Sequence, residues 1–119
     1  MIELITKEWL QTCLPGVPVY VSDEDAKDPQ RIVIDRTGGG DIQRHVRTAM
    51  LAVQSYGPTK LRAAHLHETM LHAMLRMTER PDVSAVSVNA EYNYPDYQRK
   101  ENRYQAVFNI VYYGDMENE

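Results

Sequence analysis

The chain has 119 residues, of which 43% are hydrophobic and 25% are charged, and these fractions are typical of one folded globular domain. The net charge is −4 and the basic residues form no run, which argues against a surface that grips nucleic acid. Cys13 is the single cysteine, so an intramolecular disulfide and a cysteine-based zinc cluster are excluded. With no signal-peptide pattern and no stretch of roughly 18 uncharged apolar residues, we expect a protein made in the cytosol.

The first element is predicted to be a short helix. Ile2, Ile5, Trp9 and Cys13 recur at a spacing of three to four residues, and Leu14-Pro15-Gly16 ends the pattern. We expect Trp9 to pack on the sheet or on the longer helix that follows.

Two strands are expected next. Valines alternate over residues 17–21, and a β-branched run follows at residues 31–35, after an acidic, proline-containing loop at residues 22–30. These strands are predicted to form a hairpin with a long loop. The segment RTGGGD at residues 36–41 contains three consecutive glycines, which favour a flexible connection over a fixed element.

A strand over residues 48–56 and a helix over residues 59–77 form the centre of the chain. Gly57-Pro58 separates them, and Thr59 is suited to cap the helix. The helix carries an apolar stripe made of Leu66, Met70, Ala73, Met74 and Met77. Ala64, Leu71 and Leu75 widen this stripe to more than half the circumference. One sheet cannot cover so wide an arc, so we expect a second helix or another subunit to cover the remainder.

Two more strands and a hairpin tip complete the chain. After Arg80-Pro81 ends the helix, one strand is expected to place Val86, Val88, Ala90 and Tyr92 on one face. Residues 94–102 form the tip. The last strand is expected to place Tyr104, Ala106, Phe108, Ile110 and Tyr112 on one face, with Gln105 and Asn109 on the other. The short acidic tail at residues 115–119 is expected to be frayed.

The order of these elements is αβββαββ. It predicts an α+β fold over residues 1–119, a single domain with a mostly antiparallel or mixed sheet and two helices packed on one face.

Histidines on the long helix raise the question of a metal site. His67 and His72 resemble an HExxH pair, but one residue too many separates them, so at about 100° per residue they point some 140° apart. His65, Glu68 and His72 do share one helix face, and a small metal-dependent enzyme using these three remains an alternative. The same spacing describes a solvated helix face, which we favour, so no metal, cofactor or catalytic residue is assigned. His67 lies in the apolar arc and is expected to be an interior or interface histidine.

Other motifs for chemistry are weak. The glycines at 38–40 lack the Lys-Ser/Thr of a phosphate-binding loop, and no serine lies in a GxSxG turn. Six of the eight tyrosines lie between residues 92 and 113, beside three basic residues that could help to stack nucleotides. Three acidic residues offset that charge, and tyrosine and arginine are enriched in protein interfaces. Contact between subunits is therefore the favoured interpretation.

Three segments together carry a family resemblance. They are IVIDRTGG at residues 32–39, LAVQSYG at residues 51–57 running into Ala63-Ala64, and YPD at residues 94–96 with RYQAVF at residues 103–108. In order and spacing they resemble the tail terminator, or tail completion, proteins of long-tailed bacteriophages. The resemblance implies a non-enzymatic subunit that closes into a homohexameric ring on the tail tube, halts tube growth and offers a surface to the head's connector.

On this resemblance, function is carried by interfaces. A mobile loop that orders on docking to a neighbour or to the tube is expected at Arg36, Thr37, Gly38, Gly39 and Asp41. A hairpin that bridges adjacent subunits is expected at Tyr94, Asp96, Tyr97, Arg99 and Arg103. A ring of this kind repeats one head-to-tail contact until rotation closes it.

The resemblance also implies partners and a location. They are copies of the chain itself, the tail tube protein and the head-tail connector protein, in the tail or neck of a virion assembled in the host cytoplasm. DNA would pass through the lumen without specific binding, and no membrane is involved. We expect several of Asp23, Glu24, Asp25 and Asp28 to face that lumen, because negative walls avoid contacts that hold DNA. A head-to-tail neck adaptor is the alternative role within virion assembly.

Overall fold

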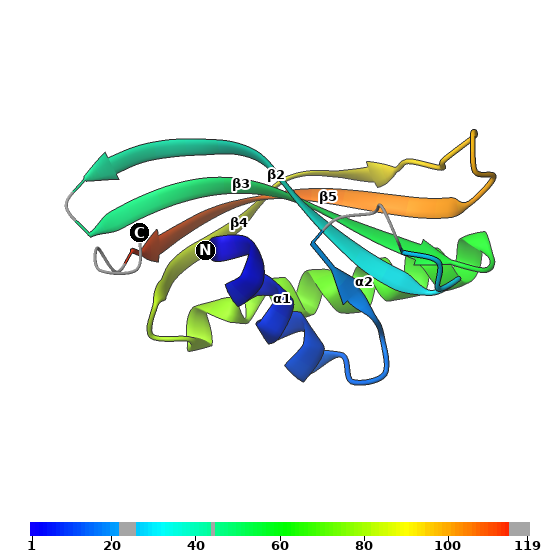
Figure 1. Ribbon diagram of the computed structural model, residues 1–119, viewed down its shortest axis with the longest axis horizontal. Coiled ribbons are helices and arrows are strands. Elements are labelled where there is room, and N and C mark those ends of the chain that lie inside the picture. Colours follow the sequence, from blue (N-terminus) through cyan, green and yellow to red (C-terminus); the bar gives the residue numbers. More distant parts are fainter. Residues whose placement is uncertain (22–25, 44, 115–119) are drawn as a thin grey trace.

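Two helices lie against one face of a five-stranded sheet in the computed structural model, which describes residues 1–21, 26–43 and 45–114 (Figure 1). The elements in chain order are α1 (Ile2–Cys13), β1 (Val19–Tyr20), β2 (Arg31–Gln43), β3 (Val46–Gly57), α2 (Lys60–Leu75), the 3₁₀ turn η1 (Met77–Glu79), β4 (Val83–Asn93) and β5 (Asn102–Tyr113). The predicted α+β fold and its αβββαββ order are confirmed. Neither α1 nor α2 is long and apolar enough to cross a membrane. The acidic tail at 115–119 lies outside the described residues.

The strands follow the order β1-β2-β3-β5-β4, and all neighbours from β2 to β4 are antiparallel. The predicted hairpin between residues 17–21 and 31–35 is wrong, because β1 pairs with β2 in parallel through Val19 with Ile32 and Tyr20 with Val33. An alternating pattern carries no information on strand direction. Direction depends instead on the end of the sheet to which the connecting residues return the chain.

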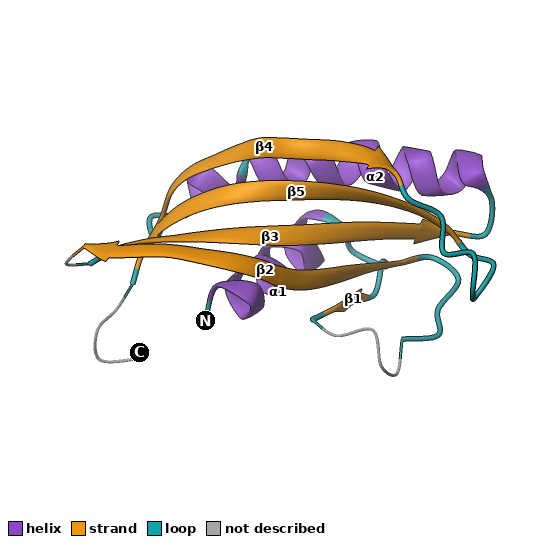
Figure 2. Ribbon diagram, turned by 90° about the horizontal axis from the view of Figure 1, so that it is seen from above, coloured by secondary structure: helices purple, strands orange, loops and turns teal. Residues whose placement is uncertain are grey.

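The glycine segment is a strand rather than the predicted mobile connection. Strand β2 continues through it to Gln43 and pairs with β3, with register shifts between Arg36 and Gly38 and between Gly39 and Ile42. Glycine permits such bulges, and pairing satisfies backbone groups that a loop would leave to water. The C-terminal part of β2, Arg36–Gln43, pairs with the first part of β3, Val46–Leu51. We call this pair of segments the arm, and its end reaches past both helices (Figure 2).

The core lies between the helices and the sheet. Apolar side chains from both layers are buried there, among them Leu10, Val53, Met70, Phe108 and Ile110. The face assignments of β5 are confirmed by its register with β3. At the start of α2 the predicted cap is also confirmed, since the Thr59 hydroxyl accepts from the backbone N–H of Arg62 at 3.1 Å.

Helix α1 covers much of the wide apolar arc on α2. The indole Nε1 of Trp9 donates to the backbone oxygen of Ala73 at 2.7 Å, so Trp9 packs on the long helix as predicted. Leu71 is buried, whereas Leu75 remains 46% exposed. The arc is therefore covered mostly within one chain. The α-helix also ends at Leu75, earlier than expected, and η1 carries the chain on to Glu79.

A bulge in β4 changes which of its side chains face the helices. Val88 pairs with Phe108, but Ala90 pairs with Val107, so Asn89 is an inserted residue. Beyond it the facing pattern reverses. The prediction that Ala90 and Tyr92 share a face with Val86 and Val88 is therefore wrong. Glu91 takes the side that faces the helices.

Candidate interaction surfaces

A chain of hydrogen bonds crosses the sheet face that points away from the helices. Arg103 donates to the Tyr56 hydroxyl at 3.2 Å, and that hydroxyl donates to Gln54 Oε1 at 3.2 Å. Gln54 Nε2 donates to Gln105 Oε1 at 2.8 Å, and Gln105 Nε2 donates to the Tyr92 hydroxyl at 2.6 Å. Each link joins two residues that are paired across neighbouring strands, or two residues that lie two positions apart on one strand and so share a face. We call this set the polar ladder, and it fixes the side chains of three strands relative to one another.

Arg31 is fully buried beside the polar ladder. Its guanidinium donates to both carboxylate oxygens of Glu101, at 2.7 and 3.2 Å, and to the backbone oxygen of Asp28 at 2.9 Å. The guanidinium carbon lies 3.7 Å from the centre of the Tyr56 ring. A buried charge requires partners of this kind, and a bidentate carboxylate is the strongest of them. The contact pins the hairpin tip to the start of β2.

The hairpin tip is ordered by its own side chains. Asp96 Oδ1 accepts from the backbone N–H groups of Gln98 and Arg99, both at 3.1 Å. Arg99 Nε lies 3.1 Å from Glu101, and Arg103 Nε donates to the Tyr94 backbone oxygen at 2.7 Å. Three of the predicted interface residues, Asp96, Arg99 and Arg103, are thus used inside the chain.

Two tyrosines remain presented at the tip. The side chain of Tyr97 is 84% exposed and that of Tyr94 is 45% exposed. Arg103 stacks 4.3 Å from the centre of the Tyr94 ring and holds it in place. Exposed tyrosines, one of them held by a stacked arginine, are typical of a protein contact.

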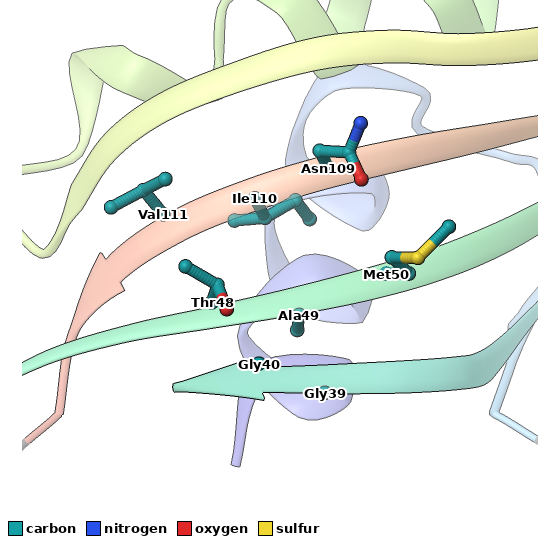
Figure 3. Close-up of a pocket in the computed structure, with 8 residues that line it drawn as sticks. All are labelled: Gly39, Gly40, Thr48, Ala49, Met50, Asn109, Ile110 and Val111. Atoms are coloured by element: carbon teal, nitrogen blue, oxygen red, sulfur yellow. The ribbon is translucent and has the colours of Figure 1, made fainter. Parts of the chain in front are cut away.

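A shallow groove of about 280 Å³ crosses the arm, away from the hairpin tip (Figure 3). It is lined by Gly39, Gly40, Thr48, Ala49, Met50, Asn109, Ile110 and Val111. Gly40 fits closely on its β2 side, because a Cβ there would lie 1.6 Å from Thr48 Oγ1 and would force the Thr48 side chain to move. The groove is therefore floored by backbone and rimmed by apolar and small polar side chains.

The first group of predicted interface residues lies along β2 in the arm. Arg36 Nε donates to the backbone oxygen of Gly38 at 3.3 Å, and the Thr37 hydroxyl donates to the backbone oxygen of Met50 at 3.4 Å. The side chain of Asp41 lies outside the described residues. The first group runs from the middle of the sheet, where Arg36 pairs with Leu51, toward the end of β2, and the second lies at the hairpin tip beyond the other end, so the structure does not bring them together (Figure 1).

Of the four acidic residues expected to face the lumen, only Asp28 lies among the described residues. Asp23, Glu24 and Asp25 lie outside the described residues. Asp28 accepts a short hydrogen bond from the Tyr20 hydroxyl, and this bond is the main cause that raises the pKa of Tyr20. Asp28 is therefore engaged with its own chain.

The histidines on α2 differ in exposure, since His65 and His72 are exposed and His67 is buried. His65, Glu68 and His72 are exposed, and within the described ranges no three histidine, cysteine or carboxylate side chains could hold a metal ion together. His67 is only 3% exposed, as predicted for an interior histidine. Its Nε2 lies 2.9 Å from Glu91 Oε1. The periodicity could not reveal this partner, since the bulge at Asn89 decides which way Glu91 faces.

Arg31, Tyr56 and Glu101 are the residues that sequence reasoning missed. The available signal was a lone arginine at the start of a β-branched strand. Such a residue also fits an exposed strand end, and its carboxylate partner lies 70 positions further along the chain.

Comparison with known proteins adds a likeness of fold. No family model matches the sequence, and no curated protein does. One chain of a solved structure described as the virion of a native gene transfer agent particle matches with a TM-score of 0.72 and 8% identity, over 95% of each chain. A crystal structure from Akkermansia muciniphila matches with a TM-score of 0.42 and 15% identity, over 71% of this chain and 42% of that one. The first match shows a fold shared over nearly the whole length of both chains.

Proposed function

We propose that the chain is a structural subunit of a phage-like virion and, within it, a tail terminator. The observation that carries the first part is the match over 95% of both chains to a component of a gene transfer agent virion. The second part rests on the three sequence segments that resemble tail terminators. In this role the chain closes into a ring, six copies by the resemblance, which caps the tail tube, stops its polymerisation and provides the surface for head joining.

The distribution of surfaces supports a ring. A head-to-tail contact joins one patch of a copy to a different patch of the next, so it needs two unlike surfaces. Strand β2 supplies Arg36, Thr37, Gly38, Gly39 and Asp41 in the arm. The hairpin tip at the other end of the sheet supplies Tyr94, Asp96, Tyr97, Arg99 and Arg103. Tyr94 and Tyr97 add exposed aromatic surface at the tip, and Arg103 stacks on the Tyr94 ring.

The remaining assignments follow from this role. The partners are copies of the chain, the tail tube protein and the head-tail connector protein, and the place of action is the tail or neck of a virion assembled in the host cytoplasm. DNA passes through the lumen without specific binding, which the net charge of −4 supports.

The proposal is tested by adding the purified chain to growing tail tubes of the same particle and measuring tube lengths by electron microscopy. A terminator arrests growth and appears as a cap at one end. Tubes that grow to the same lengths with and without the chain contradict the proposal. A chain that binds tailless heads and leaves tubes uncapped is a neck adaptor instead.

A point variant tests the hairpin tip more cleanly than its deletion. Removing residues 95–101 would also remove Glu101, whose carboxylate accepts two hydrogen bonds from the buried Arg31. Tyr97→Ala removes the exposed ring and leaves that pair intact, and we expect it to weaken capping at least tenfold. The control is Leu4→Ala, which removes a half-exposed apolar side chain of α1, away from both the arm and the hairpin tip. Equal capping by both variants would contradict the role of the tip.

A further inference from the structure

The sheet has two outer edges at which most backbone groups have no neighbouring strand among the described residues. Strand β4 ends the sheet on one side, and within the described chain nothing pairs with its outer edge. On the other side β1 pairs only with Ile32 and Val33. The outer edge of β2 is thus uncovered over residues 34–43 by any described strand.

The edge of β4 has bulges between Val83 and Ala85 and between Val88 and Ala90, which hinder strand addition there, but its last stretch, Ala90–Asn93, is regular and contains no proline. Soluble proteins prevent an exposed edge strand from pairing with another chain by placing charged residues, above all lysine, or proline on it. Strand β4 reads VSAVSVNAEYN, with no lysine, arginine or proline, and Glu91 is its one charged residue. Tyr94 donates its backbone N–H to Arg103 at 2.9 Å, so by alternation the N–H groups of Asn93 and Glu91 point out of the sheet.

The two edges match in length and direction. Strand β4 has 11 residues, and the uncovered part of β2 spans residues 34–43. Strands β2, β3, β5 and β4 alternate in direction, so β4 runs opposite to β2. Copies related by rotation about an axis along the strands keep these directions. The β4 of one copy would therefore meet the β2 of the next as an antiparallel neighbour, which continues the pattern of the sheet.

Register and charge agree with that pairing. Within one chain Ile34 is level with Glu91, through Val53 and Ala106. A stagger of two residues between copies, of the kind that strands tilted to a ring axis require, places Ile34 opposite Asn93 and Arg36 opposite Glu91. Both of these side chains lie on the side of the sheet that faces the helices, as their pairings with Leu51 and Ala106 show. A slip of one residue would put them on opposite faces. The one charged residue of β4 thus meets an opposite charge on β2.

We propose that copies of this chain join edge to edge, with β4 of one copy pairing antiparallel to residues 34–43 of β2 in the next, so that their sheets become continuous. This inference rests on the proposed function, since it specifies how the ring is built. It also assigns a part to β2 residues 36–41 that a mobile loop would not have, because their backbone becomes a ladder between copies.

The test is an oxidative cross-link between copies in a Cys13→Ser background. The chain with Arg36→Cys and Glu91→Cys brings two thiols to directly opposed positions of neighbouring copies, at a spacing that a disulfide can bridge. The control chain carries Arg36→Cys and Ser87→Cys, which displaces one thiol by four residues, about 13 Å along the strand. Both are oxidised in the assembled state and run on non-reducing gels, after circular dichroism has shown that each is folded.

Three outcomes separate the possibilities. A ladder of covalent multimers from the first chain, at least tenfold stronger than from the control, supports edge pairing. An assembled oligomer with no ladder, or an equal ladder from both chains, overturns edge pairing and leaves the proposed function standing. A chain that stays a single copy with and without tail tubes contradicts both.

A second pair of variants covers the case in which Glu91→Cys does not fold, since that change removes the partner of His67. Asn93→Pro deletes an N–H that points out of the sheet, whereas Asn93→Ala keeps it. Edge pairing predicts a rise of at least tenfold in the dissociation constant of the oligomer for the proline variant relative to the alanine variant. Equal dissociation constants would overturn edge pairing.

Discussion

The buried contact between Arg31 and Glu101 is expected to be the main polar clamp on the hairpin tip. Glu101→Gln keeps the shape of the side chain and removes its charge. It leaves the guanidinium of Arg31, which is fully buried, and that of Arg99 facing a neutral amide. A charge that has lost its partner in the interior is the costly case, because water cannot replace the carboxylate.

The size of the effect follows from the geometry. Removing one member of a buried ion pair costs about 3–5 kcal/mol, and removing one from an exposed pair costs about 0–1 kcal/mol. Glu101 is 23% exposed and glutamine can still accept one hydrogen bond, so we expect a loss between these limits, about 2 kcal/mol. For a urea slope of about 2 kcal/mol per molar, the midpoint of unfolding falls by about 1 M.

The assay is urea unfolding followed by circular dichroism, with Glu79→Gln as the matched control. Glu79 lies 3.1 Å from Arg76 in an ion pair whose two side chains are more than half exposed. We expect its loss to cost less than about 0.5 kcal/mol. Equal, small losses for both variants would refute the reasoning, since they would mean that Arg31 does not depend on Glu101.

The remaining predictions concern packing, acid stability and the helix contact. Gly57→Ala should cost at least about 2 kcal/mol in urea unfolding, because its Cβ would lie 2.5 Å from a backbone nitrogen of α2. Gly38→Ala meets ordinary contacts and should stay within about 0.5 kcal/mol; similar costs for the two would be inconsistent with this packing. The hydrogen bond from Arg80 lowers the pKa of Asp82, so its contribution to stability is present above the unfolded-state pKa and lost as pH falls through the folded-state value. Asp82→Asn should therefore flatten the decline of unfolding free energy as pH falls below about 4, the ordinary pKa of an aspartate, and an unchanged slope would count against this pair. Trp9→Phe removes the hydrogen bond to α2 and should cost about 1 kcal/mol by thermal unfolding, whereas no change would show that the bond adds nothing.

Most of the fold could be predicted because its elements are marked locally. The helix that begins after Thr59 has a cap, a breaker before it and an apolar stripe, and the alternation in β5 fixes its two faces. The predictions failed where one inserted residue, or pairing with a segment distant in sequence, determines the local structure. Asn89 reverses the facing of β4 through a bulge, and the glycine segment is held as a strand by its pairing with β3.

The candidate surfaces were less predictable for the same reason. The sequence places tyrosines and arginines near the hairpin tip, and Tyr97 is indeed exposed there. It cannot show that Arg99 and Arg103 are occupied inside the chain, because their partners come from other turns and strands. Nor can it show a free sheet edge, which exists only once the strand order is known.

The central claim is that this chain works by joining copies of itself. The most direct measurement is the molar mass of the purified chain in solution, by light scattering coupled to size exclusion, with and without tail tubes. The account predicts a discrete species at a fixed multiple of 13.7 kDa, stabilised by the tubes. A mass of one copy at every concentration, unchanged when tubes are added, would contradict it.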